Sequence, residues 1–148
     1  MDSIQARLGR PFDPAELRRI KRLWVRHSIA EDRRDIDGLI ATLAEDCVYE
    51  MVPTGQRWEG HAGARDFYTA LFAAFPDNRF ALTDIVVGPQ GVFEVATLTG
   101  TNQGPWAGVP ASGLPVSLQV LILFPWDPAA KRFSGERIWF DRGGAPAG

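Results

Sequence analysis

One carboxyl group near the C-terminal end of the chain lies in a pattern that suits acid–base chemistry. Residues 132–141 alternate with a period of two, which predicts a β-strand whose successive side chains point to opposite faces. One face would carry Ser134, Glu136, Ile138 and Phe140. If this face lines an apolar pocket, burial disfavours the charged form of Glu136 and suits it to proton transfer. The alternative is an outward Glu136 that pairs with Arg132 or Arg137.

A histidine in the first long predicted helix is a second candidate for proton transfer. His27 follows Leu17, Ile20 and Trp24 at three- and four-residue spacing, so all four would lie on one stripe. Asp32, five residues further on, could reach back to the imidazole and fix its tautomer. The other interpretation is a structural histidine in the core, with Asp32 capping the turn before the next helix.

Several polar and aromatic side chains are predicted to line the same pocket. Asn102 and Gln119 lie in strand-like segments, and burying an unpaired amide costs about 1–3 kcal/mol. A carbonyl or hydroxyl of a substrate would be a suitable partner for an inward amide. The predicted substrate-binding residues are Tyr49, Tyr68, Asn102, Trp106, Gln119, Ile138 and Phe140. The aromatic residues would suit an ordinary core or a dimer face equally well.

The sequence lacks the motifs of several other catalytic and cofactor-binding classes. His27 and His61 fall on separate predicted helices, and the sequence contains no Cys-x-x-Cys pair, so we expect no metal site. It contains neither a Gly-x-Ser-x-Gly elbow nor a phosphate-binding loop, so we expect no nucleotide and no other cofactor. Cys47 is the single cysteine, which excludes an internal disulfide. A net charge of −2 gives no reason to expect a nucleic-acid or membrane partner.

Helices come first in the chain and strands follow. Helices are expected from Pro14, around residues 36–43 and over residues 61–75. Strands are expected over residues 47–52, 79–87, 92–103, 115–126 and 132–141. This order predicts an α+β domain with helices packed on one face of a mostly antiparallel sheet. The 148 residues are expected to form one domain with flexible ends at 1–12 and 143–148. The lack of a signal peptide or of an apolar membrane-spanning segment predicts a cytoplasmic protein.

A Gly- and Pro-rich segment between two long predicted strands carries a family resemblance. Residues 100–113 read GTNQGPWAGVPASG, which resembles the Gly-Thr-His-x-Gly-x-Phe-x-Gly-x-Pro-x-Thr-Gly segment of SnoaL-like ester cyclases. These belong to the cone-shaped α+β proteins that include nuclear transport factor 2. The matching residues are Gly100, Thr101, Gly104, Gly108, Pro110 and Gly113. Trp106 replaces Phe, Ser112 replaces Thr, and Asn102 stands where the family commonly has His.

The resemblance implies a sheet that wraps around an apolar cavity, with inward side chains near the open end doing the chemistry. In the family the last strand supplies a catalytic aspartate, and its place here is taken by Ile138. Glu136, two residues earlier on the same face, is therefore the expected general acid or base. Asp141 matches the family's terminal aspartate, either as a catalytic group or as a cap of the strand end.

Related enzymes suggest roles for two more sites. Tyr49 resembles the tyrosine that helps to hold water in limonene epoxide hydrolases, but Met51 stands where those enzymes have its Asn partner. The pair of His27 and Asp32 resembles an arrangement in dehydratases of the same fold.

Two functions are consistent with these features. The first is a cofactor-independent cyclase or isomerase that acts on a hydrophobic oxygenated molecule such as a polyketide, with dehydration (a lyase reaction) or epoxide opening as variants. The second is a non-catalytic ligand-binding or dimerisation module. A cavity plugged by Ile138, Phe140 and Trp side chains would favour the second. The resemblance also implies a homodimer, with Val116, Leu118, Val120 and Ile122 expected on the outer face of the sheet.

Overall fold

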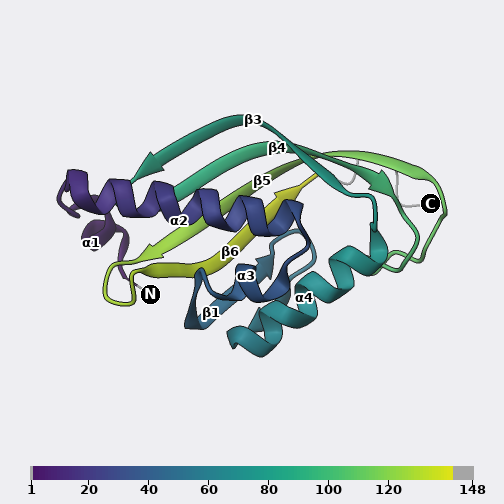
Figure 1. Cartoon of the computed structure of the whole chain (residues 1–148), viewed down its shortest axis with the longest axis horizontal. Helices are drawn as coiled ribbons and strands as arrows, with labels where there is room; N and C mark the ends of the chain where they lie inside the picture. Colours follow the sequence, from purple (N-terminus) through teal and green to yellow (C-terminus); the bar gives the residue numbers. More distant parts are fainter. Residues whose placement is uncertain (1, 142–148) are drawn as a thin grey trace.

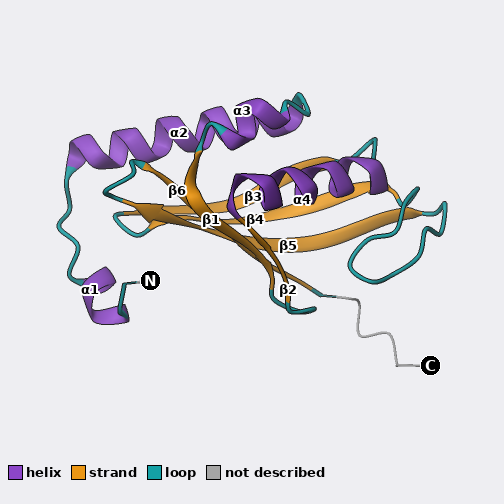
Figure 2. Cartoon of the chain, turned by 90° about the horizontal axis from the view of Figure 1, so that it is seen from below, coloured by secondary structure: helices purple, strands orange, loops and turns teal. Residues whose placement is uncertain are grey.

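Helices pack on one face of a curved six-stranded sheet in this computed structural model, which describes residues 2–141 (Figures 1 and 2). The helices are α1 (Ile4–Leu8), α2 (Pro14–Asp32), α3 (Ile36–Ile40) and α4 (Gly60–Ala74). The strands are β1 (Leu43–Met51), β2 (Gln56–Glu59), β3 (Arg79–Gly88), β4 (Gly91–Thr101), β5 (Pro115–Asp127) and β6 (Arg132–Phe140). Figure 2 shows α2, α3 and α4 on the same side of the sheet. The predicted α+β class is confirmed.

The strand order places the first strand beside the last. The sheet runs β2-β1-β6-β5-β4-β3, and its neighbouring strands are antiparallel except for the parallel pair of β1 and β6. β2, which the sequence analysis missed, forms a hairpin with β1. In the register of the parallel pair, Tyr49 lies beside Glu136. Neighbouring residues in adjacent strands share a face of the sheet, so this pairing brings both side chains to the side covered by helices.

Helix α2 begins as its sequence indicates and turns its apolar stripe inward. Asp13 is the N-cap, and its Oδ1 accepts a hydrogen bond of 2.9 Å from the Ala15 amide, with Pro14 at the first helical position. The buried residues of the helix are Ile20, Leu23, His27 and Ala30. Their three- and four-residue spacing places His27 in the core, between α2 and the sheet.

Gly135 changes the alternation of β6. It has a φ of 111°, and a Cβ atom there would collide with the carbonyl of Val48 in the neighbouring strand. The backbone irregularity puts Phe133 and Glu136 on the same inner face, where both are buried. Ser134 instead borders a groove that Arg137 also lines, so the prediction that Ser134 shares the face of Glu136 is wrong. The prediction for Glu136, Ile138 and Phe140 is confirmed, since all three border one cavity.

The N-terminal segment has a defined arrangement in the described part of the chain. Arg10 donates hydrogen bonds to the carbonyl oxygens of Pro89 at 3.2 Å and Trp126 at 3.0 Å, and it forms an ion pair with Asp2. The expected flexibility of residues 1–12 stays a prediction, and residues 143–148 lie outside the described residues. Over residues 2–141 no helix has the length and apolar character needed to cross a membrane.

Candidate active site

Four buried polar side chains from four elements meet at one carboxyl oxygen. Glu136 Oε1 accepts hydrogen bonds from the hydroxyls of Tyr68 at 2.8 Å and Tyr49 at 3.1 Å, and it lies 3.0 Å from His27 Nε2. The two tyrosine hydroxyls are 2.7 Å apart. The four residues are at most 2% exposed. Hydrogen bonds of this number offset the cost of burying a charged carboxylate.

The tautomer of His27 follows from its other neighbour, Thr42. The Thr42 hydroxyl donates to the Leu39 carbonyl at 2.7 Å, so it can only accept from the imidazole, whose Nδ1 lies 2.7 Å away. Nδ1 therefore carries a proton, which leaves Nε2 to take up or release one toward Glu136. The prediction that Asp32 fixes this tautomer is wrong, because Asp32 is exposed at the end of α2 and the two ring nitrogens contact Thr42 and Glu136. The cap of α3 is Asp35, not Asp32.

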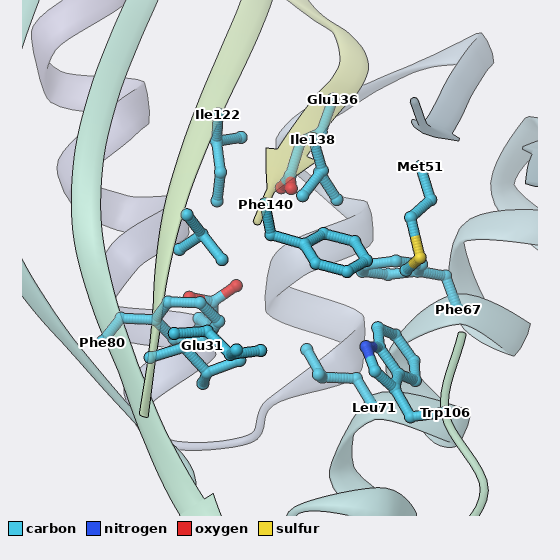
Figure 3. A pocket seen from close by; sticks show the side chains of 13 residues that line it. Glu31, Met51, Phe67, Leu71, Phe80, Trp106, Ile122, Glu136, Ile138 and Phe140 are labelled. Carbon is cyan, nitrogen blue, oxygen red and sulfur yellow. The ribbon is translucent and has the colours of Figure 1, made fainter. Parts of the chain in front are cut away.

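Glu136 borders an apolar cavity between the sheet and α4 (Figure 3). Figure 3 shows the rings of Phe67, Trp106 and Phe140 close together on one side of this cavity. Its volume is about 30 Å³, which is enough for water, since about 10–15 Å³ of such space holds one molecule. Ligand sites for larger molecules typically enclose about 300–1,000 Å³. A ring-bearing ligand would therefore require some of these side chains to move.

A second carboxyl group, which the sequence analysis missed, borders the same cavity. Glu31 lies four residues after His27, and ligand atoms of His27, Glu31 and Glu136 all lie within 4.8 Å of one another. Burial, followed by the nearby charges of Glu136, Glu94 and Asp32, raises the pKa of Glu31 well above its usual 4.5. Its place on the helical stripe of His27 was the available signal.

A polar chamber adjoins the cavity behind Glu31. This chamber has a volume of about 60 Å³, and its lining includes Glu31, Glu94, Ser28 and Trp24. The Trp24 indole nitrogen donates to Glu94 Oε2 at 3.2 Å. Burial and the charge of Glu136 raise the pKa of Glu94 to about 7, although the bond from Trp24 lowers it. Glu94 precedes the inward residues Ala96 and Leu98 at a spacing of two in the same strand, so the sequence alone could have predicted its inward orientation.

Two of the predicted substrate-binding residues lie behind the catalytic candidate. Tyr49 and Tyr68 are fully buried, and neither is among the residues that border the cavity. Their hydroxyls are engaged by each other and by Glu136. Of the remaining predicted residues, Trp106, Ile138 and Phe140 border the cavity.

Gln119 and Asp141 lie away from the cavity. Leu118, Val120 and Ile122 border it, so the intervening Gln119 points to the opposite face, where it is exposed. The predicted inward position of Gln119 is therefore wrong, as is the predicted outward position of these three apolar residues. Asp141 is exposed, directly beyond the end of β6.

Asn102 is buried, but it holds a loop rather than facing the cavity. Its backbone exchanges hydrogen bonds with Leu114 and Gly113, and its Nδ2 donates to the Pro110 carbonyl at 3.4 Å. Its Oδ1 is buried with no hydrogen-bond partner among the described residues. The loop that it anchors carries Trp106 over the cavity, so Asn102 acts on the site through this loop.

Comparison with known proteins gives a family and a set of similar folds. The family model for SnoaL-like polyketide cyclases matches residues 17–144. A candidate SnoaL-like polyketide cyclase from Jannaschia sp. CCS1 is 25% identical, with a TM-score of 0.75 over 90% of this chain and 92% of that one. AclR, a candidate hydroxylase from Streptomyces galilaeus, is 21% identical, with a TM-score of 0.66 over 82% of this chain and 74% of AclR.

A further similar structure is that of TerC, crystallised with polyporic acid. It is 15% identical, with a TM-score of 0.66 over 83% of this chain and 92% of TerC. No curated protein matches the sequence.

Proposed function

Because the chain belongs to the SnoaL-like polyketide cyclase family, we propose that it is a cofactor-independent enzyme of the cyclase or isomerase type. Its substrate would be a hydrophobic, oxygenated small molecule such as a polyketide. The observation that carries this proposal is Glu136, a carboxyl group held by three neighbours at one oxygen while it borders an apolar cavity. The ligand in TerC, polyporic acid, supports a small-molecule partner of this kind.

Glu136 would act as the general base. Its Oε1 is engaged, whereas Oε2 receives no hydrogen bond from the described residues. Oε2 would take a proton from a carbon next to a substrate carbonyl, which leaves an enolate that can close a ring or be protonated elsewhere. His27 Nε2 would exchange this proton with Glu136, since its Nδ1 is already a donor to Thr42. Tyr49 and Tyr68 then serve as positioning residues for Glu136.

Dehydration would use the same groups. Epoxide opening is supported less well, because Met51 borders the cavity where an amide would be needed to hold water.

A direct test follows proton abstraction from β-tetralone, a bicyclic ketone, by deuterium exchange in heavy water and NMR. The wild type should accelerate exchange over buffer, and Glu136→Gln should lower this rate by about 10²–10⁴-fold, the usual contribution of a positioned proton-transfer group. Glu45→Gln makes the same change at an exposed position and should leave the rate unchanged. Equal rates for Glu136→Gln and Glu45→Gln would refute the assignment of Glu136 as the base.

The small cavity favours a second candidate function, a non-catalytic binding module. Ile138, Phe140 and Trp106 border a cavity of about 30 Å³, which is far smaller than a typical ligand site of about 300–1,000 Å³. Binding of β-tetralone or polyporic acid by calorimetry, with no exchange above the buffer rate, would support this alternative over the enzyme.

We also propose a homodimer formed through the outer face of the sheet. Phe93, Val95, Leu121, Leu123 and Trp139 alternate with inward residues, are paired across β4, β5 and β6, and remain partly exposed. A contiguous apolar face of this kind is typical of an interaction surface. Sedimentation at micromolar concentration should show a dimer, and Leu121→Glu should convert it to a monomer. A wild type that sediments only near 16 kDa would contradict the proposal.

A further inference from the structure

We propose that Glu31 is the second proton-transfer group of this site, an acid that protonates the substrate oxygen while Glu136 removes a proton from carbon. The inference rests on the proposed function and adds a catalytic residue to it. Glu31 and Glu136 are the two ionisable side chains among the described residues that line the cavity. Figure 3 shows their carboxyl groups on the lining, with apolar side chains around them.

The two carboxyl groups differ in their surroundings. Glu136 Oε1 accepts hydrogen bonds from the hydroxyls of Tyr49 and Tyr68, whereas Glu31 receives no hydrogen bond from the described residues. Two carboxylates within 4.8 Å of each other in a dry pocket cannot easily both be ionised. The proton therefore belongs on Glu31, because hydrogen bonds stabilise the charged form of its neighbour.

The charged groups that face Glu31 also favour the neutral form of its carboxyl group. Glu136 approaches from β6 and Glu94 from β4, while Asp32 and His27 belong to its own helix. Burial raises the pKa of Glu31, and the three carboxylates raise it further, which favours the neutral form of this side chain. It keeps some accessible surface because it borders both the cavity and the polar chamber.

The step balances with these two groups alone. Glu136 takes the proton from the α-carbon, and the electron pair of the broken C–H bond forms the enol C=C bond. The π electrons of the carbonyl move to its oxygen, which takes the proton of Glu31. Glu136 ends protonated and Glu31 ionised. Both groups are restored when Glu136 delivers its proton to another carbon and Glu31 takes back the proton of the enol oxygen, which completes an isomerisation. Water in the polar chamber, which Glu31 and Glu94 share, would exchange these protons with solvent.

The first experiment reads the protonation of Glu31 without a substrate. Infrared spectra at pH 7 should show the carbonyl band of a neutral carboxyl group in the wild type and in Glu45→Gln. In Glu31→Gln this band should lose intensity, and Glu31→Asp, which keeps the acid, should retain it. Identical spectra for Glu31→Gln and Glu45→Gln would show that Glu31 is ionised and would overturn the proposal.

The second experiment measures deuterium exchange of β-tetralone against pH. The wild-type rate should fall at high pH as Glu31 loses its proton, and Glu31→Gln should lower the rate about 10²-fold and abolish this fall. If Glu136→Gln loses activity while Glu31→Gln matches Glu45→Gln, the role of Glu31 fails and the proposed function stands. If both match Glu45→Gln, the proposed function fails. Tight, stoichiometric Mn²⁺ binding that disappears in Glu31→Gln would make Glu31 a metal ligand and overturn its role as an acid.

Discussion

Replacing Glu94 by glutamine should stabilise the protein, and the gain should depend on pH. Glu94 is 7% exposed, and burial together with the charge of Glu136 raises its pKa from 4.5 to about 7. The amide has nearly the same shape, carries no charge, and its oxygen can still accept the hydrogen bond from Trp24. The substitution therefore removes the titration and leaves the packing intact.

The size of the effect follows from proton linkage at Glu94. Below pH 4.5 the side chain is protonated in both the folded and the unfolded protein, so the variant and the wild type should be equally stable. Between pH 4.5 and 7 the unfolded chain loses the proton first, and the free energy of unfolding of the wild type falls. The rise in pKa from 4.5 to about 7 corresponds to about 3 kcal/mol. Glu94→Gln escapes this loss and should be more stable by about that amount at pH 8.

Urea denaturation of both proteins at pH 4 and pH 8 measures this difference, with Glu45→Gln as the exposed control. The gain at pH 8 should shrink in a Glu136→Gln background, because the charge of Glu136 is the second cause of the raised pKa of Glu94. A gain that is the same at pH 4 and pH 8 would refute the reasoning, since it would come from packing rather than from ionisation.

Three further predictions concern the backbone, the imidazole and the cavity. Gly135→Ala should lower the free energy of unfolding, measured by heat or urea, by more than about 3 kcal/mol. Gly108→Ala is also at positive φ but in open space, and it should lower this free energy by about 1–2 kcal/mol. Equal losses would contradict the close contact at Gly135. Thr42→Val removes the acceptor for His27 Nδ1 and should destabilise the protein by about 1–3 kcal/mol, whereas Thr42→Ser should restore the stability. If Thr42→Val is as stable as the wild type, the tautomer assignment is wrong. Trp106→Ala should enlarge the cavity and tighten the binding of β-tetralone in calorimetry, and unchanged affinity would show that this side chain does not limit access.

The sequence predicts the arrangement of β6 except where one glycine intervenes. Apolar residues alternate after Glu136, so its inward face can be predicted from the period of a strand. Ser134 was placed wrongly because the pattern before Gly135 depends on its contact with Val48, which is distant in the sequence. A β-bulge of this kind shifts the faces without changing the composition of the strand.

The hydrogen-bond partners of a side chain are harder to predict from the sequence than the face of the strand or helix on which it lies. His27 and Asp32 are close in the sequence, and this proximity suggested a pair, yet the helix turns Asp32 outward while Thr42 lies beside the ring. Gln119 was placed inward because its own strand has apolar residues on both faces, so alternation alone could not identify the buried one. Glu31 was missed because a charged residue on a helix is usually solvated.

The parallel pairing of β1 with β6 makes the site depend on the synthesis of nearly the whole chain. Glu136 is separated by 109 residues from His27, by 87 from Tyr49 and by 68 from Tyr68. On a ribosome, the helices and the first five strands emerge before the strand that fills the gap between β1 and β5. Until β6 inserts, both neighbours present open edges and the two tyrosines lack the carboxylate that they hold. Such distant contacts slow folding, and the nascent chain is exposed to mispairing at these edges during that interval.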